Sequence, residues 1–161
     1  MIESIGVEEL APQDGAAMVG RCSAEEIGPF VGTAYAAVGE ALARQGLHPV
    51  GPPFVRYGTS GEDGMDESGG AMVFHVTAGF PCSGRLTAEG DVVPVVLQSG
   101  TAVVAVHVGA WTDMGAAYAA VAEHMAEHGL QRAGDPWETY LDGPEVEVHR
   151  TLLRAPCRAK A

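Results

Sequence analysis

The chain carries an internal repeat that constrains its fold more than any other feature. Residues 32–57 (GTAYAAVGEALARQGLHPVGPPFVRY) return at residues 115–140 (GAAYAAVAEHMAEHGLQRAGDPWETY), with 13 of 26 positions identical and no gap. Composition alone predicts roughly two or three matches in such a window, and a spacing of 83 residues is too long for one unit of a solenoid. The repeat therefore indicates two copies of one supersecondary unit.

Length and charge narrow the class of protein. A chain of 161 residues suits a single domain, residues 1–161, with pseudo-repeats at about 1–82 and 91–157. Its 9 basic and 21 acidic side chains give a net charge of −12, which repels nucleic acids and anionic membranes. We therefore expect neither nucleic-acid nor membrane binding.

The chain lacks the sequence signals of export. Its first ten residues, MIESIGVEEL, have no basic start and no long apolar run, so we expect a bacterial-type cytoplasmic protein without a signal peptide. The apolar stretch at residues 92–108 is interrupted by Pro94 and Gly100, which predicts two strands and a turn in place of a membrane span.

The cysteines and histidines do not form a recognisable metal motif. Cys22, Cys82 and Cys157 are odd in number and lack CxxC spacing, so we interpret them as reduced, buried thiols. His124 and His128 are spaced i, i+4, but the segment is not HExxH and shows no third ligand. We expect neither a metal nor a cofactor.

Each copy of the repeat predicts a strand, a helix and two further strands. In the second copy, residues 101–108 alternate in polarity as a strand does, and Tyr118, Val121 and Met125 form a helical stripe that ends at Gly129. In the first copy, residues 16–22 and the helix from Tyr35 to Gly46 are the counterparts.

The closing and leading strands complete the two units. We predict closing strands at residues 72–77 and 146–152, and a leading strand before each unit at residues 2–10 and 92–97. Residues 58–70 are rich in glycine and acid and predict a flexible loop. The result is an α+β domain: a tandem β–α–β–β repeat with pseudo-twofold symmetry, whose antiparallel sheet has helices on one face and a ligand groove between the halves.

The two copies differ at a position that can carry chemistry, where Val55 of the first copy is replaced by Glu138 in the second. Because alternate strand residues share a face, Glu138 lies on the same face as Tyr140. We expect Trp137 to pack beneath a helix, which would turn Glu138 toward the opposite face and the groove. A carboxylate among aromatic rings favours flat, hydrophobic cations, although most strand glutamates are simply solvated.

The chain resembles the GyrI-like small-molecule-binding family, which includes the effector domains of multidrug-sensing transcription activators. The resemblance covers nearly the whole chain and rests on residues 103–111, on Tyr118, on His128-Gly129-Leu130 and above all on Asp135-Pro136-Trp137-Glu138-Thr139-Tyr140. It implies two βαββ units around a groove, in which Glu138 contacts cationic drugs. We find no DNA-binding segment and expect a stand-alone relative, not a complete transcription factor.

Three functions follow from this reading. The first is a binding protein for hydrophobic, cationic small molecules, with Glu138 as the counter-charge. The aromatic walls of its groove would be Tyr140, Tyr57, Trp111 and Phe30. Trp111 and Phe30 follow glycines ahead of the helices and are expected at the rim, whereas Tyr35 and Tyr118 are assigned to the core.

The alternatives use the same domain differently. A hydrolase of cyclopropane-bearing or other strained electrophilic natural products would use Glu138 to activate water and a tyrosine hydroxyl to donate a proton. An acidic inhibitor or partner of a DNA-binding enzyme such as gyrase would rely on the net charge of −12. Edge strands, including residues 92–97, also leave room for a homodimer.

Overall fold

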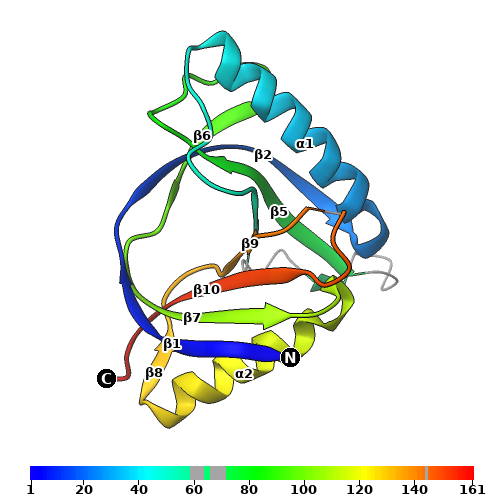
Figure 1. The fold of residues 1–161 in the computed structure, drawn as a ribbon. Helices are drawn as coiled ribbons and strands as arrows, with labels where there is room; N and C mark the ends of the chain where they lie inside the picture. Colours follow the sequence, from blue (N-terminus) through cyan, green and yellow to red (C-terminus); the bar gives the residue numbers. More distant parts are fainter. Residues whose placement is uncertain (59–63, 66–71, 144) are drawn as a thin grey trace. The chain divides into compact units, whose positions relative to one another are not determined.

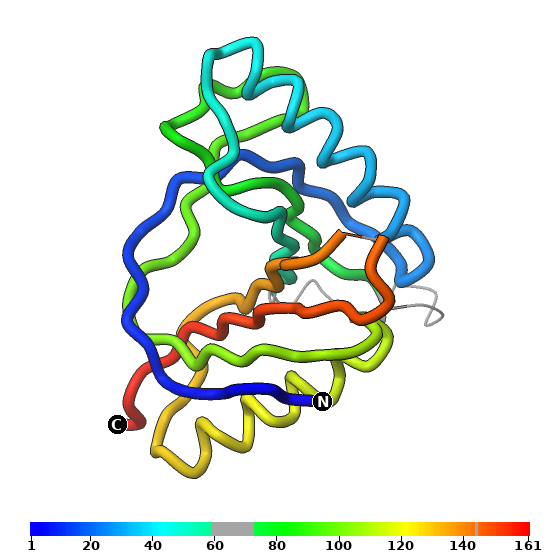
Figure 2. The backbone as a smooth tube through the Cα atoms, viewed as in Figure 1, coloured from blue at the N-terminus to red at the C-terminus, as the bar shows by residue number. Residues whose placement is uncertain are grey.

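A computed structural model describes residues 1–58, 64–65, 72–143 and 145–161. The chain divides into two compact units, the first made of Met1–Pro12 with Gln98–Ala161 and the second of Gln13–Leu97. Each unit is an antiparallel sheet packed against one long helix, which confirms the α+β class (Figure 1). The tube in Figure 2 shows that the chain both begins and ends in the first unit.

The first unit carries the second copy of the repeat. Its four main strands follow the order β1-β7-β10-β9, every neighbouring pair is antiparallel, and a short strand, β8, pairs with the end of β10. These elements are β1 (Ile2–Leu10), β7 (Gly100–Val108), a 3-10 turn η1 (Trp111–Asp113), α2 (Met114–Glu127), β8 (Leu130–Arg132), β9 (Trp137–Tyr140) and β10 (Arg150–Ala159).

The second unit carries the first copy and has a comparable plan. Its strands follow the order β3-β5-β2-β6, again antiparallel throughout, and β4 pairs with the beginning of β5. The elements are β2 (Gln13–Ser23), α1 (Ala24–Arg44), β3 (Phe54–Tyr57), β4 (Gly64–Met65), β5 (Met72–Pro81) and β6 (Val92–Leu97). Apart from Gly64–Met65 and Gly58, the loop expected at residues 58–70 lies outside the described residues.

The leading strands are exchanged between the copies. We expected residues 2–10 to precede the first unit and residues 92–97 to precede the second, and both strands form with those bounds. However, β1 pairs with β7 of the second copy, and β6 pairs with β2 of the first. The compact units therefore differ from the pseudo-repeats at about 1–82 and 91–157, because a leading strand can pair with any edge that its connection reaches.

Both helices end as the sequence predicts. Gly46 follows α1 with φ +71° and Gly129 follows α2 with φ +66°, a left-handed conformation that glycine adopts without steric cost. At its other end α1 begins with a capping box between Ser23 and Glu26 and continues through Pro29. Phe30 consequently lies inside the helix and not ahead of it, which corrects the expected equivalence with Trp111.

The second closing strand begins later than expected. We predicted residues 146–152, but β10 spans Arg150–Ala159, and Val146 and Val148 are exposed. The strand starts at Arg150, whose backbone N–H and guanidinium donate hydrogen bonds to the Asp142 carboxylate. Side-chain capping of this kind competes with strand pairing over the residues between the two partners.

Each sheet buries its helix-facing side. In the first unit α2 packs on a core that includes Val103, Ala105 and Leu153, and in the second α1 packs on a core that includes Ala16 and Val92. Cys22, Cys82 and Cys157 are buried free thiols, as predicted, and burial raises the pKa of each. No helix within the described residues is long and apolar enough to cross a membrane.

Candidate functional site

The side chain of Glu138 is buried in the first unit between two tyrosines. Only 5% of Glu138 is exposed. The Tyr118 hydroxyl on α2 donates to its Oε2 at 2.6 Å, and the Tyr140 hydroxyl, two residues along β9, donates to its Oε1 at 2.9 Å. Both carboxylate oxygens are therefore oriented by phenol donors.

Burial raises the pKa of the Glu138 carboxyl, and the hydrogen bonds from Tyr118 and Tyr140 partly counter that effect. Desolvation penalises the charged form, whereas donors to a carboxylate favour it. Across the residues that the structure describes, no basic side chain forms an ion pair with Glu138. The site thus holds an acid whose negative charge has hydrogen bonds but no cation.

Strand register places Glu138 on the helix-covered face of its sheet. Glu138 lies opposite Leu153 on β10, and Leu153 belongs to the core beneath α2. Trp137 lies opposite Arg154 and points to the other face, where it is also buried. Our expectation was the reverse, because period-two alternation tells which residues share a face without telling which face the helix covers.

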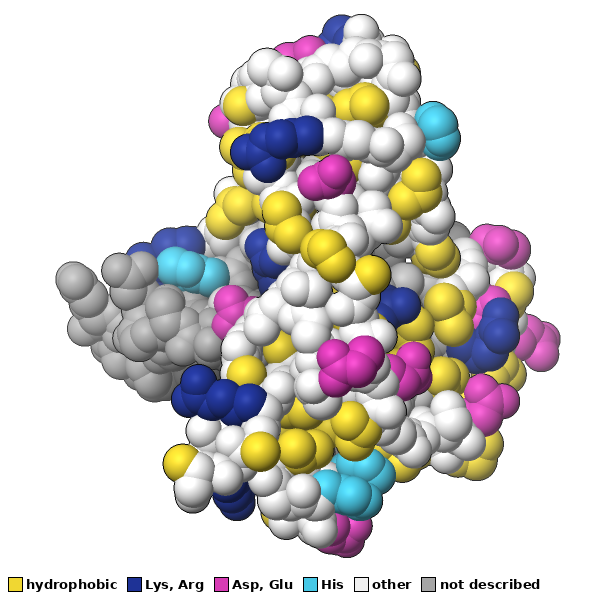
Figure 3. Space-filling view, turned by 90° about the vertical axis from the view of Figure 1, so that its left-hand side faces the viewer, with side chains coloured by type: hydrophobic (Ala, Val, Ile, Leu, Met, Phe, Trp, Pro, Cys, Tyr) yellow, Lys and Arg dark blue, Asp and Glu magenta, His cyan; other side chains and the backbone are white. Residues whose placement is uncertain are grey.

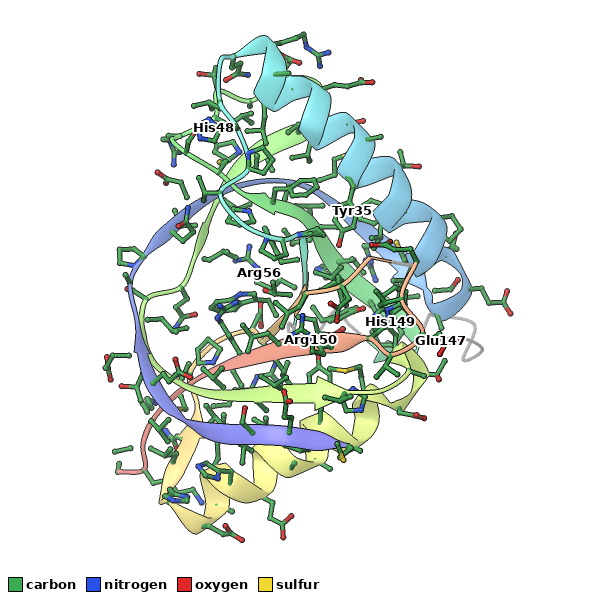
Figure 4. All side chains as sticks on the ribbon, viewed as in Figure 1. Tyr35, His48, Arg56, Glu147, His149 and Arg150 are labelled. Atoms are coloured by element: carbon green, nitrogen blue, oxygen red, sulfur yellow. The ribbon has the colours of Figure 1, made fainter. Side chains whose placement is uncertain are left out.

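An exposed tryptophan borders this site. Trp111, from η1, has 45% of its surface exposed. Its ring meets the Tyr140 ring edge-on at 5.6 Å between centroids and lies against the His149 ring at 4.4 Å with a 30° tilt. His149 directly precedes β10, next to the Arg150–Asp142 ion pair that holds this turn (Figure 4). The predicted residues Glu138, Tyr140 and Trp111 are therefore in one cluster.

The same face contains a buried polar pair next to Tyr140. Thr151 lies opposite Tyr140 on one side and opposite His107 of β7 on the other. Both Thr151 and His107 are fully buried, and neither the threonine hydroxyl nor either imidazole nitrogen has a hydrogen-bond partner in the described ranges of the chain. An unpaired buried polar group costs on the order of 1–3 kcal/mol, so two adjacent ones require a reason.

The second unit shows what this arrangement looks like without the acid. Val55, the counterpart of Glu138, is 1% exposed. Tyr35, the counterpart of Tyr118, donates instead to the backbone carbonyl of Phe54 at 3.4 Å, and its ring contacts Phe80 at 5.3 Å (Figure 4). The repeat keeps both helix tyrosines: the Tyr118 hydroxyl donates to the Glu138 carboxylate, and the Tyr35 hydroxyl donates to the Phe54 carbonyl.

Two predicted site residues belong to this second unit. Tyr57 contacts Phe74 edge-on at 6.3 Å, and Phe30 packs against Gly20, where an added Cβ would lie 2.7 Å from the ring. Tyr57 and Val55 pair with Val76 and Ala78 of β5, both of which are buried. A groove that joins these residues to Glu138 stays a prediction.

Sequence reasoning missed three members of the Glu138 cluster. Tyr118 was assigned to the core because it lies on the apolar stripe of its helix, yet its hydroxyl bonds the acid. His107 was counted only as one position of an alternating strand, and Thr151 only as part of a closing strand. A usable signal was present: His107 and Thr151 are polar residues on strand faces whose neighbouring positions, such as Ala105 and Leu153, are apolar.

A second histidine cluster lies at the end of α2. His124 and His128 stack at 4.1 Å, and Glu127 supplies the third side chain that the sequence did not reveal, with all three ligand atoms within 4.8 Å of one another. The His128 Nδ1 lies 2.9 Å from the His124 carbonyl oxygen. Glu127 and His128 are exposed, so solvent competes with any ion there.

The surface charge is dispersed. On the face shown in Figure 3, acidic side chains lie scattered among hydrophobic and uncharged ones. The net charge of −12 therefore has no single acidic patch as its source on that face.

The fold is that of an α+β domain, and the match to a family model defines its class as a small-molecule binding domain. The model of the GyrI-like small molecule binding domain matches residues 4–156. The chain belongs to the GyrI-like family. No curated protein matches the sequence.

Solved structures share the fold at low identity. The C-terminal domain of EcmrR is similar with a TM-score of 0.77 and 15% identity, covering 98% of both chains. EcmrR in its DNA complex is similar with a TM-score of 0.74 and 15% identity, and there the alignment covers 98% of this chain and 58% of the other. A hydrolase from Listeria innocua has a TM-score of 0.63 and 16% identity, with 96% of this chain and 91% of that chain covered. Identities this low compare folds, not activities.

Proposed function

We propose that this domain captures hydrophobic cationic small molecules and that Glu138 is the counter-charge. The main support for this proposal is the Glu138 carboxylate, of which only 5% is exposed. It accepts hydrogen bonds from two tyrosine hydroxyls and has no basic partner in the described part of the chain. An isolated buried anion is unfavourable until an opposite charge arrives. A cation is therefore the ligand whose charge the site lacks.

The aromatic residues around Glu138 suit the rest of such a ligand. Tyr118 and Tyr140 hold the carboxylate oxygens, and the partly exposed ring of Trp111 contacts Tyr140. Aromatic faces attract cations within about 6 Å and pack against flat apolar groups. Tyr57 and Phe30 remain proposed walls from the second unit.

The test compares a cation with its neutral analogue. Isothermal titration with N-methylquinolinium and with neutral methylquinoline separates charge recognition from apolar contact. We expect Glu138→Gln to weaken binding of the cation about tenfold or more and to leave binding of the neutral compound nearly unchanged. The matched control is Glu123→Gln, which removes one charge from an exposed position of α2. Equal loss in both variants would mean that only net charge matters.

A pH series adds an independent check. Because the carboxyl has a raised pKa, protons compete with the cation, and cation affinity should fall as the pH is lowered through that pKa. Glu138→Gln should remove this dependence. A wild-type affinity that does not change with pH over the acid range would reject the counter-charge role.

Hydrolysis of a strained electrophile is the second candidate, and one observation favours it. A carboxyl with a raised pKa at 2.6 Å from a tyrosine hydroxyl is a suitable proton-transfer pair. Mass spectrometry of cyclopropane-bearing compounds after incubation would reveal a hydrated product. Turnover that Glu138→Gln abolishes supports the hydrolase, whereas unchanged compound supports binding alone.

A further inference from the structure

The buried polar pair of His107 and Thr151 lies one row away from the acid. Across strands β7, β10 and β9, His107, Thr151 and Tyr140 stand opposite one another. The neighbouring row on the same face is Ala105, Leu153 and Glu138. Rows on one face are two residues apart, or about 7 Å. A ligand the size of a fused bicyclic ring can span that distance.

The pair offers hydrogen bonds that the protein does not use. His107 and Thr151 face each other across the ladder at 0% exposure, yet no hydrogen bond joins them and neither has another partner among the described residues. Cross-strand neighbours of this kind have Cβ atoms about 5 Å apart. Each side chain is therefore available to a third group.

The surroundings of His107 favour the neutral form of its ring. Burial lowers the pKa of its imidazole, the nearby N-terminal ammonium lowers it further, and Asp113 acts in the opposite direction. A neutral imidazole has one donor and one acceptor, and a threonine hydroxyl can act as either. The pair is thus complementary to a ligand group that both donates and accepts hydrogen bonds.

Trp111 stands next to the Tyr140 end of this row. The indole contacts Tyr140, which lies across from Thr151, and it also contacts His149, which directly precedes β10. Trp111 is 45% exposed and belongs to a three-residue turn with no buried residue, so a ligand would reach this row from the side of its ring. Gly109, with φ +140°, lies against the His107 ring on the neighbouring strand end.

We propose that His107 and Thr151 form a hydrogen-bonding subsite for an uncharged hydroxyl or carboxamide group of the ligand. This inference rests on the proposed function, in which Glu138 receives the cationic end of the same molecule. The preferred ligand is then a flat aromatic cation that carries a carboxamide or hydroxyl about one ring away from its charge.

Three probes test this subsite separately from Glu138. They are N-methylquinolinium, its carboxamide derivative and the neutral quinoline carboxamide, each titrated into wild type and Thr151→Val. The substitution replaces a hydroxyl by a methyl group of similar size. We expect this substitution to weaken binding of both carboxamides about tenfold more than binding of the parent cation. The reason is that the carboxamide would lose its hydrogen bond to the threonine hydroxyl and be left unpaired in a buried site.

A stability measurement on the free protein completes the test. Removing an unpaired hydroxyl should raise the melting temperature of Thr151→Val by about 2–4 °C. The matched control is Thr139→Val on the other face of the sheet, where the hydroxyl accepts a hydrogen bond from Arg154 at 3.0 Å. That control should lower the melting temperature.

The outcomes separate the two proposals. Equal effects of Thr151→Val on all three probes, or a lowered melting temperature of that variant, would overturn the subsite even if Glu138→Gln abolishes cation binding. Conversely, if Thr151→Val selectively weakens binding of the neutral carboxamide, the subsite is supported even if Glu138→Gln does not change cation binding. Failure of both carboxamides to bind wild type rejects the subsite outright.

Discussion

Tyr118 on α2 donates a 2.6 Å hydrogen bond to Glu138 on β9, so the helix and the sheet of the first unit are joined through a buried acid. In the second unit, the equivalent Tyr35 donates a hydrogen bond to the backbone carbonyl of Phe54 at 3.4 Å. In both units a helix tyrosine thus donates to the short strand that follows the helix, and in the first unit its acceptor is a carboxylate.

Replacing Glu138 by glutamine should stabilise the free protein at neutral pH. The folded-state pKa of Glu138 is raised, so its contribution to stability is fully present below the unfolded pKa and is lost as the pH rises through the folded pKa. Glutamine keeps the shape without the charge. Calorimetry should show a higher melting temperature for Glu138→Gln near pH 7.5, by about 2–4 °C for each kcal/mol gained.

The same comparison of melting temperatures at acidic pH is the control. Near about pH 3, more than one unit below the ordinary glutamate pKa, both states of the wild type carry a mostly protonated Glu138, and the two melting temperatures should converge. If the increase in melting temperature of Glu138→Gln does not depend on pH, the effect arises from packing and not from the charge.

Removing the Tyr118 hydroxyl should destabilise the protein through Glu138. A hydrogen bond to a charged group contributes about 1.5–3 kcal/mol, so Tyr118→Phe should lower the free energy of unfolding by that order at neutral pH. Tyr35→Phe is the matched control and should cost about 0.5–1 kcal/mol, because its 3.4 Å bond goes to a neutral carbonyl.

A double-mutant cycle in urea distinguishes the tyrosine–acid bond from tyrosine packing. The cost of Tyr118→Phe should shrink in the Glu138→Gln background, because the charged acceptor is gone. Identical costs in both backgrounds would contradict coupling between the two side chains.

The two tryptophans should report differently on ligand binding. Trp111 borders the Glu138 cluster and is 45% exposed, whereas Trp137 is 2% exposed on the opposite face of the sheet. Titrating N-methylquinolinium into Trp137→Phe should therefore still change the tryptophan fluorescence, and Trp111→Phe should remove most of that change. The opposite result would move the binding site to the other face.

Introducing the acid into the other copy should be costly. Val55 is 1% exposed, and the nearby Tyr35 hydroxyl donates to a backbone carbonyl, so Val55→Glu buries a charge without a cation. We expect a loss of about 3–5 kcal/mol in urea unfolding at neutral pH. The control is Val96→Glu in the same unit, where 49% exposure predicts a change within about 0.5 kcal/mol.

Several features could be predicted from local sequence because they depend on neighbours in the chain. Gly46 and Gly129 end their helices in both copies, and the strands at residues 2–10 and 92–97 form with the predicted bounds. The α+β class follows from such elements. By contrast, the start of β10 was misplaced because it depends on a side-chain bond between Asp142 and Arg150, eight residues apart.

Candidate site residues were predictable by type but not by arrangement. Glu138 stood out as the residue that broke the repeat, and Tyr140 and Trp111 join it in the structure. Tyr118 could not be separated from the core, because an aromatic residue on a helix stripe looks the same whether its hydroxyl meets a carbonyl or a carboxylate.

The sequence by itself determined the duplication, the strand and helix content, the helix stops and the position at which the two copies diverge, since all of these rest on periodicity and local backbone preference. The tertiary structure decided which face α2 covers and with which sheet each leading strand pairs. It also decided that the Tyr118 hydroxyl reaches Glu138 and that Thr151 and His107 lie in the neighbouring row. Those outcomes depend on strand register and on contacts between residues distant in the chain. Alternation along a single strand shows which residues share a face, but it does not show which of the two faces the helix covers.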